Sequence, residues 1–197
     1  RETSLLVDIF TLNYGRVRCV AKGFRKPNKK GISRALFPFT QYSFSWQGRS
    51  DLKTLTQSDT AESPLFLHGK SMFTGLYVNE LLYRLLHEYD PHENLFERYQ
   101  ALLTKLTAGE LIEADLRQLE INLLDELGYG LVLDAESVTG EPLSLEKYYR
   151  YIPDQGLVDM GIRNGSSSGG YSGADLIALN NSDLRNISVQ RTAKHLL

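Results

Sequence analysis

Residues 5–22 read LLVDIFTLNYGRVRCVAK, and the alternation of their side chains sets the architecture of the N-terminal part of the chain. Apolar residues recur at every second position on both sides of Asn13-Tyr14-Gly15, a pattern typical of two strands joined by a turn. A period of two gives the second strand an apolar face and a basic face. The basic face comprises Arg16, Arg18 and Lys22. The segment therefore predicts a β-hairpin with a basic stripe on its second strand.

Strand character continues to about residue 60. Residues 23–34 are rich in Lys and Arg, contain two glycines and a proline, and are expected to form a basic loop. Residues 36–46 and 52–56 resume strand character on either side of Gly48. Short strands with turn signals about every ten residues favour a small barrel or sandwich.

After Pro64 the apolar residues recur with a period near 3.6, which indicates helices. Helices are expected over 72–90, 95–108 and 111–127, closed by Gly109 and Gly128, and these three should pack together. Residues 129–171 read as irregular, with short strands near 131–133 and 148–152, and helices are expected over 173–179 and 183–197. The predicted fold class is therefore α+β, with a β domain over 1–62 and a helical domain over 63–197.

Composition and charge exclude several kinds of site and favour one class of partner. The 197 residues are 42% apolar and 23% charged, a balance that buries a core, and the single cysteine excludes an internal disulfide and a Cys-cluster zinc site. Residues 1–60 hold 11 Lys/Arg against 4 Asp/Glu, whereas residues 61–197 hold 11 against 20. This asymmetry favours a polyanionic partner for the basic part. No apolar run is long enough to span a membrane, and we expect a cytoplasmic protein.

No pattern indicates catalysis or a cofactor. His87 and His92 are five residues apart with Pro91 between them, so their rings would not share a helical face as zinc ligands must. The glycines of residues 165–170 lack the Gly-Lys-Ser/Thr ending of a phosphate-binding loop. Cys19 falls among the core-facing positions of a strand. We expect no enzyme, no metal and no cofactor.

Basic residues interleaved with aromatic ones on a small β domain favour single-stranded nucleic acid, because cations follow the backbone and rings stack on unpaired bases. The candidate contact residues are Arg16, Arg18, Lys22, Arg25, Lys26, Lys29, Lys30 and Arg34. Tyr14, Phe24 and Tyr42 are candidate stacking residues, whereas the aromatics of residues 37–46 are otherwise expected in the core. The same features suit DNA, RNA or an acidic protein, so a DNA-binding protein, an RNA-binding protein and an interaction scaffold all stay open.

Several segments together resemble the RecO family of bacterial DNA-repair proteins. In the N-terminal part they are Glu2-Thr-Ser-Leu, Asp8-Ile-Phe-Thr11, Gly15-Arg-Val-Arg-Cys-Val-Ala-Lys-Gly23, Pro38-Phe-Thr40 and Leu52-Lys-Thr-Leu55. In the helical part they are Gly75-Leu-Tyr-Val-Asn-Glu-Leu-Leu82, Leu116-Arg-Gln-Leu-Glu120 and Leu127-Gly-Tyr-Gly130. The likeness covers most of the chain in the family order.

The resemblance implies an N-terminal OB-fold β-barrel followed by a helical domain. It also implies binding to single- and double-stranded DNA and annealing of strands, without covalent catalysis. The implied partners are RecR, the C-terminal tail of single-stranded-DNA-binding protein and, indirectly, RecA. The task would be recombinational DNA repair in the cytoplasm, at the bacterial nucleoid.

Two departures from the family pattern, and one matching residue, refine these expectations. Many relatives carry a four-cysteine zinc site after the Leu-Gly-Tyr segment, but residues 134–140 contain no cysteine, so a metal-free branch is expected. The family's chain begins about one strand earlier, so the first barrel strand would precede residue 1. Arg117 matches an arginine that holds the tail peptide, which a guanidinium can do by gripping a terminal carboxylate. The alternative is an exposed helix arginine that pairs with Glu113 or with carboxylates on the Asp115 side.

Overall fold

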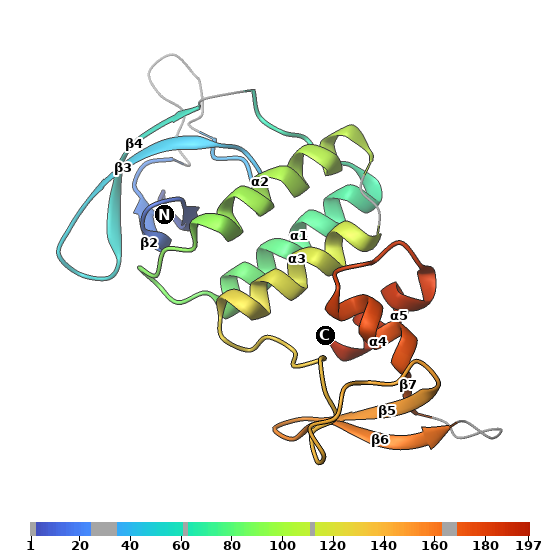
Figure 1. Ribbon diagram of the computed structural model, residues 1–197. Coiled ribbons are helices and arrows are strands. Elements are labelled where there is room, and N and C mark those ends of the chain that lie inside the picture. The colour runs from blue at the N-terminus through green and yellow to red at the C-terminus, as the bar shows by residue number, and fades with distance from the viewer. Residues whose placement is uncertain (1–2, 25–34, 61–62, 111–112, 163–168) are drawn as a thin grey trace. The chain divides into compact units, whose positions relative to one another are not determined.

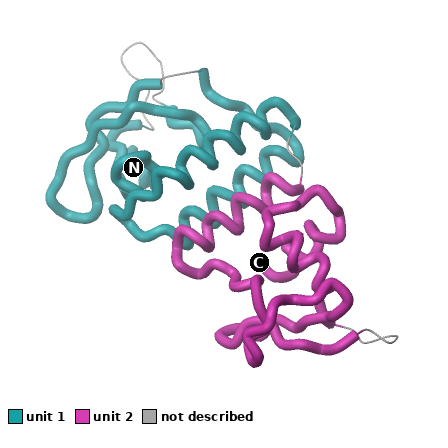
Figure 2. Tube along the Cα trace, in the orientation of Figure 1, with its two compact units in different colours: residues 1–111 teal, residues 112–197 magenta. Residues whose placement is uncertain are grey.

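The computed structural model describes residues 3–24, 35–60, 63–110, 113–162 and 169–197 (Figure 1). Five of the predicted basic residues, Arg25, Lys26, Lys29, Lys30 and Arg34, lie outside the described residues. The chain forms two compact units, residues 1–111 and 112–197 (Figure 2). The first unit groups two helices with the N-terminal strands, whereas the sequence predicts a domain boundary at residue 62.

The N-terminal unit contains a four-stranded sheet. Its strands are β1 (Leu5–Thr11), β2 (Gly15–Ala21), β3 (Tyr42–Gln47) and β4 (Lys53–Thr60), in the order β1-β2-β4-β3. The pairing of β2 with β4 is parallel, and the other two pairings are antiparallel. In this order β1 and β3 are the edges of the sheet. The α+β fold with an N-terminal OB-type sheet is as predicted.

The predicted hairpin is present, and its alternation holds. Leu5 pairs with Ala21 and Thr11 with Gly15, and the burial of β2 switches at every residue. The buried side chains of this sheet form one cluster with Phe24, consisting of Ile9, Val17, Cys19, Ala21, Phe24 and Leu55. Gly15 turns the chain with φ +63°, and a Cβ there would lie 2.0 Å from the Asp90 carbonyl oxygen. Only glycine allows this close approach of the two backbones.

The third strand begins six residues later than predicted. Phe39 has φ +64°, a left-handed conformation that interrupts the extended run expected from Leu36. Its ring is buried against α1, where a Cβ at Gly75 would lie 2.8 Å from Phe39 Cε1. Phe39 is therefore a core residue, as predicted, but it reaches the core from a loop.

Two helices complete the described part of this unit: α1 (Gly69–Leu85) and α2 (Glu93–Ala108). Their apolar residues repeat at helical spacing and bury, among others, Val78, Leu82, Leu95, Leu102 and Leu106. Gly109 ends α2 in the left-handed conformation expected of a C-terminal cap. None of the helices in the described part of the chain is long and apolar enough to cross a membrane.

The described residues of the second unit form three helices and a small sheet. The elements are α3 (Glu113–Glu126), β5 (Lys147–Ile152), β6 (Gly156–Ile162), β7 (Tyr171–Ser172), α4 (Gly173–Asn180) and α5 (Ile187–Leu196). The sheet order is β6-β5-β7, with both pairings antiparallel. The strand near 148–152 is confirmed, β6 was not predicted, and residues 131–133 form no strand. The core of the unit includes Leu133, Tyr149, Leu157, Leu176 and Val189.

Candidate nucleic-acid interface

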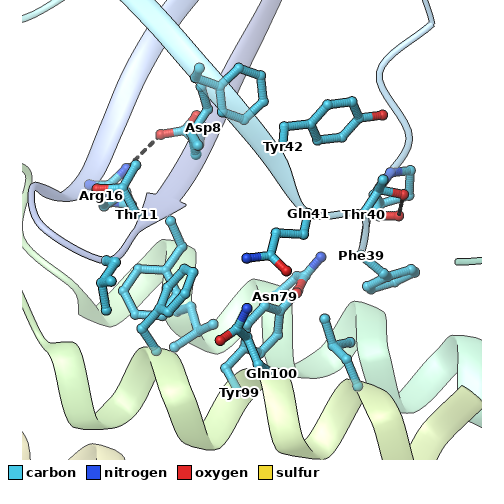
Figure 3. Close-up of a pocket in the computed structure, with 18 of the residues that line it drawn as sticks. Asp8, Thr11, Arg16, Phe39, Thr40, Gln41, Tyr42, Asn79, Tyr99 and Gln100 are labelled. Atoms are coloured by element: carbon cyan, nitrogen blue, oxygen red, sulfur yellow. Dashed lines mark hydrogen bonds and ion pairs between the residues drawn. The ribbon is translucent and has the colours of Figure 1, made fainter. Parts of the chain in front are cut away.

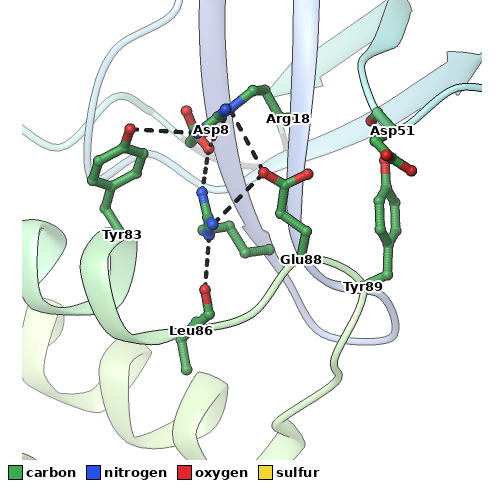
Figure 4. Close-up of polar contacts among 8 residues, drawn as sticks. Asp8, Arg18, Asp51, Tyr83, Leu86, Glu88 and Tyr89 are labelled. Atoms are coloured by element: carbon green, nitrogen blue, oxygen red, sulfur yellow. Dashed lines mark hydrogen bonds and ion pairs between the residues drawn. The ribbon is translucent and has the colours of Figure 1, made fainter.

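Arg16 lies on the polar face of β2, as predicted, but its guanidinium is used within the fold (Figure 4). Nη1 donates to Asp8 Oδ1 at 2.8 Å, and Nε donates to the Leu86 carbonyl oxygen at 3.0 Å. Nη2 lies 3.6 Å from Glu88 Oε1, and only 14% of the side chain is exposed. Arg16 therefore links the sheet to the segment that follows α1.

Arg18 is the more accessible of the two strand arginines. Its Nε lies 3.3 Å from Asp8 Oδ1 and 3.8 Å from Glu88 Oε1, and its Nη2 donates to Tyr83 Oη at 3.3 Å (Figure 4). The Asp8 carboxylate raises the pKa of Arg18 above its ordinary value. A third of the side chain stays exposed, so Arg18 can meet a phosphate at the surface.

Backbone contacts support this cluster of Asp8, Arg16, Arg18, Tyr83 and Glu88, which we call the arginine cluster. Arg16 and Glu88 form an isolated parallel bridge, and the Tyr89 amide donates to the Arg16 carbonyl oxygen at 3.1 Å. Tyr89 Oη donates to the Asp51 carbonyl oxygen. Two cations and two carboxylates compensate one another here, so the cluster contributes little net charge.

Lys22 follows β2 and is exposed. Of the candidate stacking residues, Tyr14 is exposed and packs edge-on against Trp46, with ring centroids 5.3 Å apart. Tyr42 is half-buried and stacks on Phe44 at 5.1 Å. Phe24 is only 6% exposed, so its prediction as a stacking residue is wrong: the chain after Ala21 turns its ring into the core of the sheet.

A cleft of about 920 Å³ opens beside the arginine cluster, within the N-terminal unit (Figure 3). Strand β1, residues 36–46 and both helices contribute to its wall. The labelled side chains include three amides that reach the cleft from separate segments: Gln41, Asn79 and Gln100. Sequence reasoning missed this feature because residues so far apart carry no shared motif.

Arg117 lies on α3 and is buried, not exposed as a surface helix arginine would be. Nη1 donates to Glu120 Oε2 at 2.6 Å, and Nη2 lies 3.1 Å from Glu113 Oε1. The pairing with Glu113 that the sequence allowed is therefore present. Arg117 Nε forms no hydrogen bond with any described residue.

Residues 134–142, where the sequence predicts no zinc site, contain a turn built around a carboxylate. Glu136 Oε2 accepts hydrogen bonds from the Val138 and Thr139 amides, at 3.0 and 2.6 Å, and from Thr139 Oγ1 at 2.8 Å. These bonds, those from Thr139 first, lower the pKa of Glu136. Ala135 and Pro142 form an isolated antiparallel bridge that closes the turn.

Other candidate chemistries find no site in the described residues. No three His, Cys, Asp or Glu side chains of the described part gather as metal ligands. Cys19 is buried in the sheet, and this burial raises the pKa of its thiol to about 11, which disfavours the nucleophilic thiolate.

Comparison with known proteins covers both parts of the chain. Residues 1–64 match the family model described as recombination protein O N terminal, and residues 69–187 match recombination protein O C terminal. The DNA repair protein RecO of Methylococcus capsulatus is 38% identical over 197 residues, which are 100% of this chain and 79% of that protein. The protein of the same name from Coxiella burnetii is 39% identical over 198 residues, covering 100% and 83%. That of Actinobacillus pleuropneumoniae is 37% identical over 194 residues, covering 98% and 79%.

Proposed function

The chain belongs to the RecO family of DNA repair proteins, and from this premise we propose that it is a non-catalytic recombination mediator. It binds single- and double-stranded DNA and anneals complementary strands. With RecR, it helps to load RecA onto DNA coated by single-stranded-DNA-binding protein. Such a task on chromosomal DNA places the protein in the cytoplasm at the nucleoid.

The observation that carries the DNA-binding part is the exposed basic end of β2. Arg18 lies on the polar face of β2, and Lys22 follows the last residue of that strand and is exposed. The basic residues among 25–34, which lie outside the described residues, follow in the sequence and are proposed as further phosphate contacts. Arg16 is proposed to position Arg18 through the arginine cluster, because its own donors are engaged within the fold.

Salt dependence tests this assignment. The affinity of the full chain for a labelled single strand, measured by fluorescence anisotropy, should fall steeply between low and physiological salt as counterions are released. The double variant Arg18→Ala/Lys22→Ala should reduce the slope of log K against log salt by about 1.4, or roughly 0.7 for each phosphate contact on a single strand.

A charge-matched control separates local contact from net charge. Arg191→Ala/Lys194→Ala removes two exposed cations of α5 and should leave the slope unchanged. Equal loss in both double variants would contradict the assignment to β2. Competition by RNA of the same sequence then distinguishes a DNA mediator from an RNA-binding protein, and failure to bind either strand would favour a protein-interaction scaffold.

The peptide-binding part is assigned to Arg117 on α3. A guanidinium can hold the terminal carboxylate of the acidic tail of single-stranded-DNA-binding protein with two parallel hydrogen bonds. Glu113, with 47% of its side chain exposed, is the partner that an incoming carboxylate would displace. Glu113→Gln should therefore strengthen binding of a synthetic tail peptide, whereas Arg117→Met should weaken it. Calorimetry that finds the Glu113→Gln affinity unchanged or lower would argue against this site.

A further inference from the structure

The two carboxylates of the arginine cluster are bound in different ways. Asp8 Oδ1 accepts hydrogen bonds from Arg16 Nη1 at 2.8 Å and from Arg18 Nε at 3.3 Å. Glu88 Oε1 lies 3.6 Å from Arg16 Nη2 and 3.8 Å from Arg18 Nε, so neither contact is a hydrogen bond (Figure 4). Glu88 therefore adds negative charge to the cluster without the hydrogen bonds that fix Asp8.

The electrostatics of Arg18 show the same difference. The charge of Asp8 and its hydrogen bond raise the pKa of Arg18, and Glu88 contributes less to this rise. The side chains of Arg18 and Glu88 are 33% and 25% exposed. An ion pair of this length between partly exposed groups is weak, because water screens it. An anion that binds Arg18 more closely would therefore displace Glu88 at little cost to the fold.

The backbone of Glu88 is fixed, whereas its carboxylate is held by the two long ion pairs. Glu88 and Arg16 form an isolated parallel bridge, and the Tyr89 amide donates to the Arg16 carbonyl oxygen at 3.1 Å. Tyr89 Oη donates to the Asp51 carbonyl oxygen and fixes the same segment a second time (Figure 4). The carboxylate can thus leave the arginines by rotation of its own side chain, with no movement of the segment after α1.

The two guanidinium groups have supports that do not involve Glu88. The centre of the Arg16 guanidinium lies 5.1 Å from the centroid of the Tyr83 ring, and that of Arg18 lies 6.0 Å from it. Arg18 Nη2 also donates to Tyr83 Oη at 3.3 Å. When Glu88 rotates away, two cations face the single carboxylate of Asp8, so the cluster carries one net positive charge. A guanidinium in this setting suits a phosphate, to which it can donate two parallel hydrogen bonds.

We propose that the Glu88 carboxylate occupies, in the free protein, the place that one strand phosphate takes beside Arg18, and that DNA binds there by displacing it. This inference rests on the proposed binding of single-stranded DNA and gives Glu88 control over its strength. Because the carboxylate returns to Arg18 as a phosphate leaves, the contact is readily reversible. Reversible contacts suit a protein that releases its strands after annealing them.

The test measures the affinity of the full chain for a labelled oligothymidylate by fluorescence anisotropy, in wild type and in Glu88→Gln. Glutamine keeps the length of the side chain and removes the charge that competes with the phosphate. At low salt the variant should bind roughly two- to fivefold more tightly, as expected for loss of one partly exposed ionic competitor. The gain should shrink as salt is raised, because ions screen the repulsion between carboxylate and phosphate. Tighter binding cannot result from a misfolded variant.

Two further variants separate competition at Arg18 from a change in net charge. Glu97→Gln removes an exposed carboxylate of α2 outside the cluster, and it should change the affinity much less than Glu88→Gln does. In the Arg18→Ala background, Glu88→Gln should give no gain beyond that of Glu97→Gln. The cation for which carboxylate and phosphate compete is then absent, so the two changes are not additive.

Several outcomes would overturn the proposal while leaving DNA binding intact. Equal gains in Glu88→Gln and Glu97→Gln would show that net charge alone acts. A gain that persists without Arg18 would place the effect of Glu88 elsewhere. Unchanged or lower affinity of Glu88→Gln would show that the carboxylate does not compete with the strand. If neither wild type nor Glu88→Gln binds the strand at low salt, the proposed function itself fails.

Discussion

Arg16 of β2 and Arg117 of α3 show two ways of holding a guanidinium inside a fold. Arg16 is bonded to two other parts of the N-terminal unit, to Asp8 of β1 and to the segment after α1, where Leu86 is 70 residues away. Arg117 is paired within its own helix, with Glu113 four residues before it and Glu120 three residues after it. Arg16 therefore depends on tertiary structure, whereas the pairs of Arg117 follow from the helix alone.

This difference predicts that removing Arg16 destabilises the fold more than removing Arg117. Arg16→Ala should lower the free energy of unfolding by about 3 kcal/mol, because a poorly exposed cation with two carboxylates and a carbonyl as partners is removed. Urea unfolding measures this loss. Arg18→Ala, at the more exposed position, should cost less than about 1 kcal/mol. Equal losses in the two variants would show that Arg16 does not have the linking role.

Arg117→Met measures how much the ion pairs within α3 contribute to stability. The change removes a cation 2.6 Å from the buried Glu120 carboxylate, and we expect a loss of about 2 kcal/mol in the same urea experiment. Adding Glu120→Leu to this variant should restore much of the loss, since an apolar pair of similar volume tolerates burial. The corresponding pair of changes at Asp8 and Arg16 should not recover stability, because the Leu86 carbonyl would still lose its donor.

The smallest loss of stability is expected on replacing Glu136, whose hydrogen-bond partners lie within its own turn. Its pKa is lowered in the folded state, so its contribution to stability is full above the unfolded pKa and is lost as pH falls through the folded one. The melting temperature of Glu136→Gln should thus lie a few degrees below wild type at pH 7. The difference in melting temperature should close as the pH falls through the lowered pKa of the carboxyl, and a difference independent of pH would contradict the role of the carboxylate.

The elements that could be predicted from the sequence are those with a regular pattern of apolar residues. The β1–β2 hairpin and the five helices of the described residues were predicted because periods of 2 and 3.6 are visible in short windows. Strand β6 was missed because Asp159 and Gly161 interrupt its apolar run. Asp159 is held by Lys147 at 2.6 Å across the strand pair, a contact that no window of β6 contains.

The same reasoning explains which site residues were found. The basic face of β2 follows from alternation. Glu113 was named as one alternative partner of Arg117, whereas Glu120, the partner at 2.6 Å, was not predicted. The engagement of Arg16 with Leu86 and Glu88 could not be predicted, because it needs the segment after α1 to return to the sheet. Gln41, Asn79 and Gln100 become neighbours only once the strands and both helices are in place.

The large sequence separation between Arg16 and its partner Leu86 also matters during synthesis of the chain. A ribosome adds roughly 5–20 residues each second, so the 70 residues between Arg16 and Leu86 take on the order of 4–14 s to synthesise. During that interval the nascent hairpin carries two arginines against the single carboxylate of Asp8, since Glu88 has not yet been made. The N-terminal sheet therefore reaches its final balance of charge only after α1 has left the ribosome.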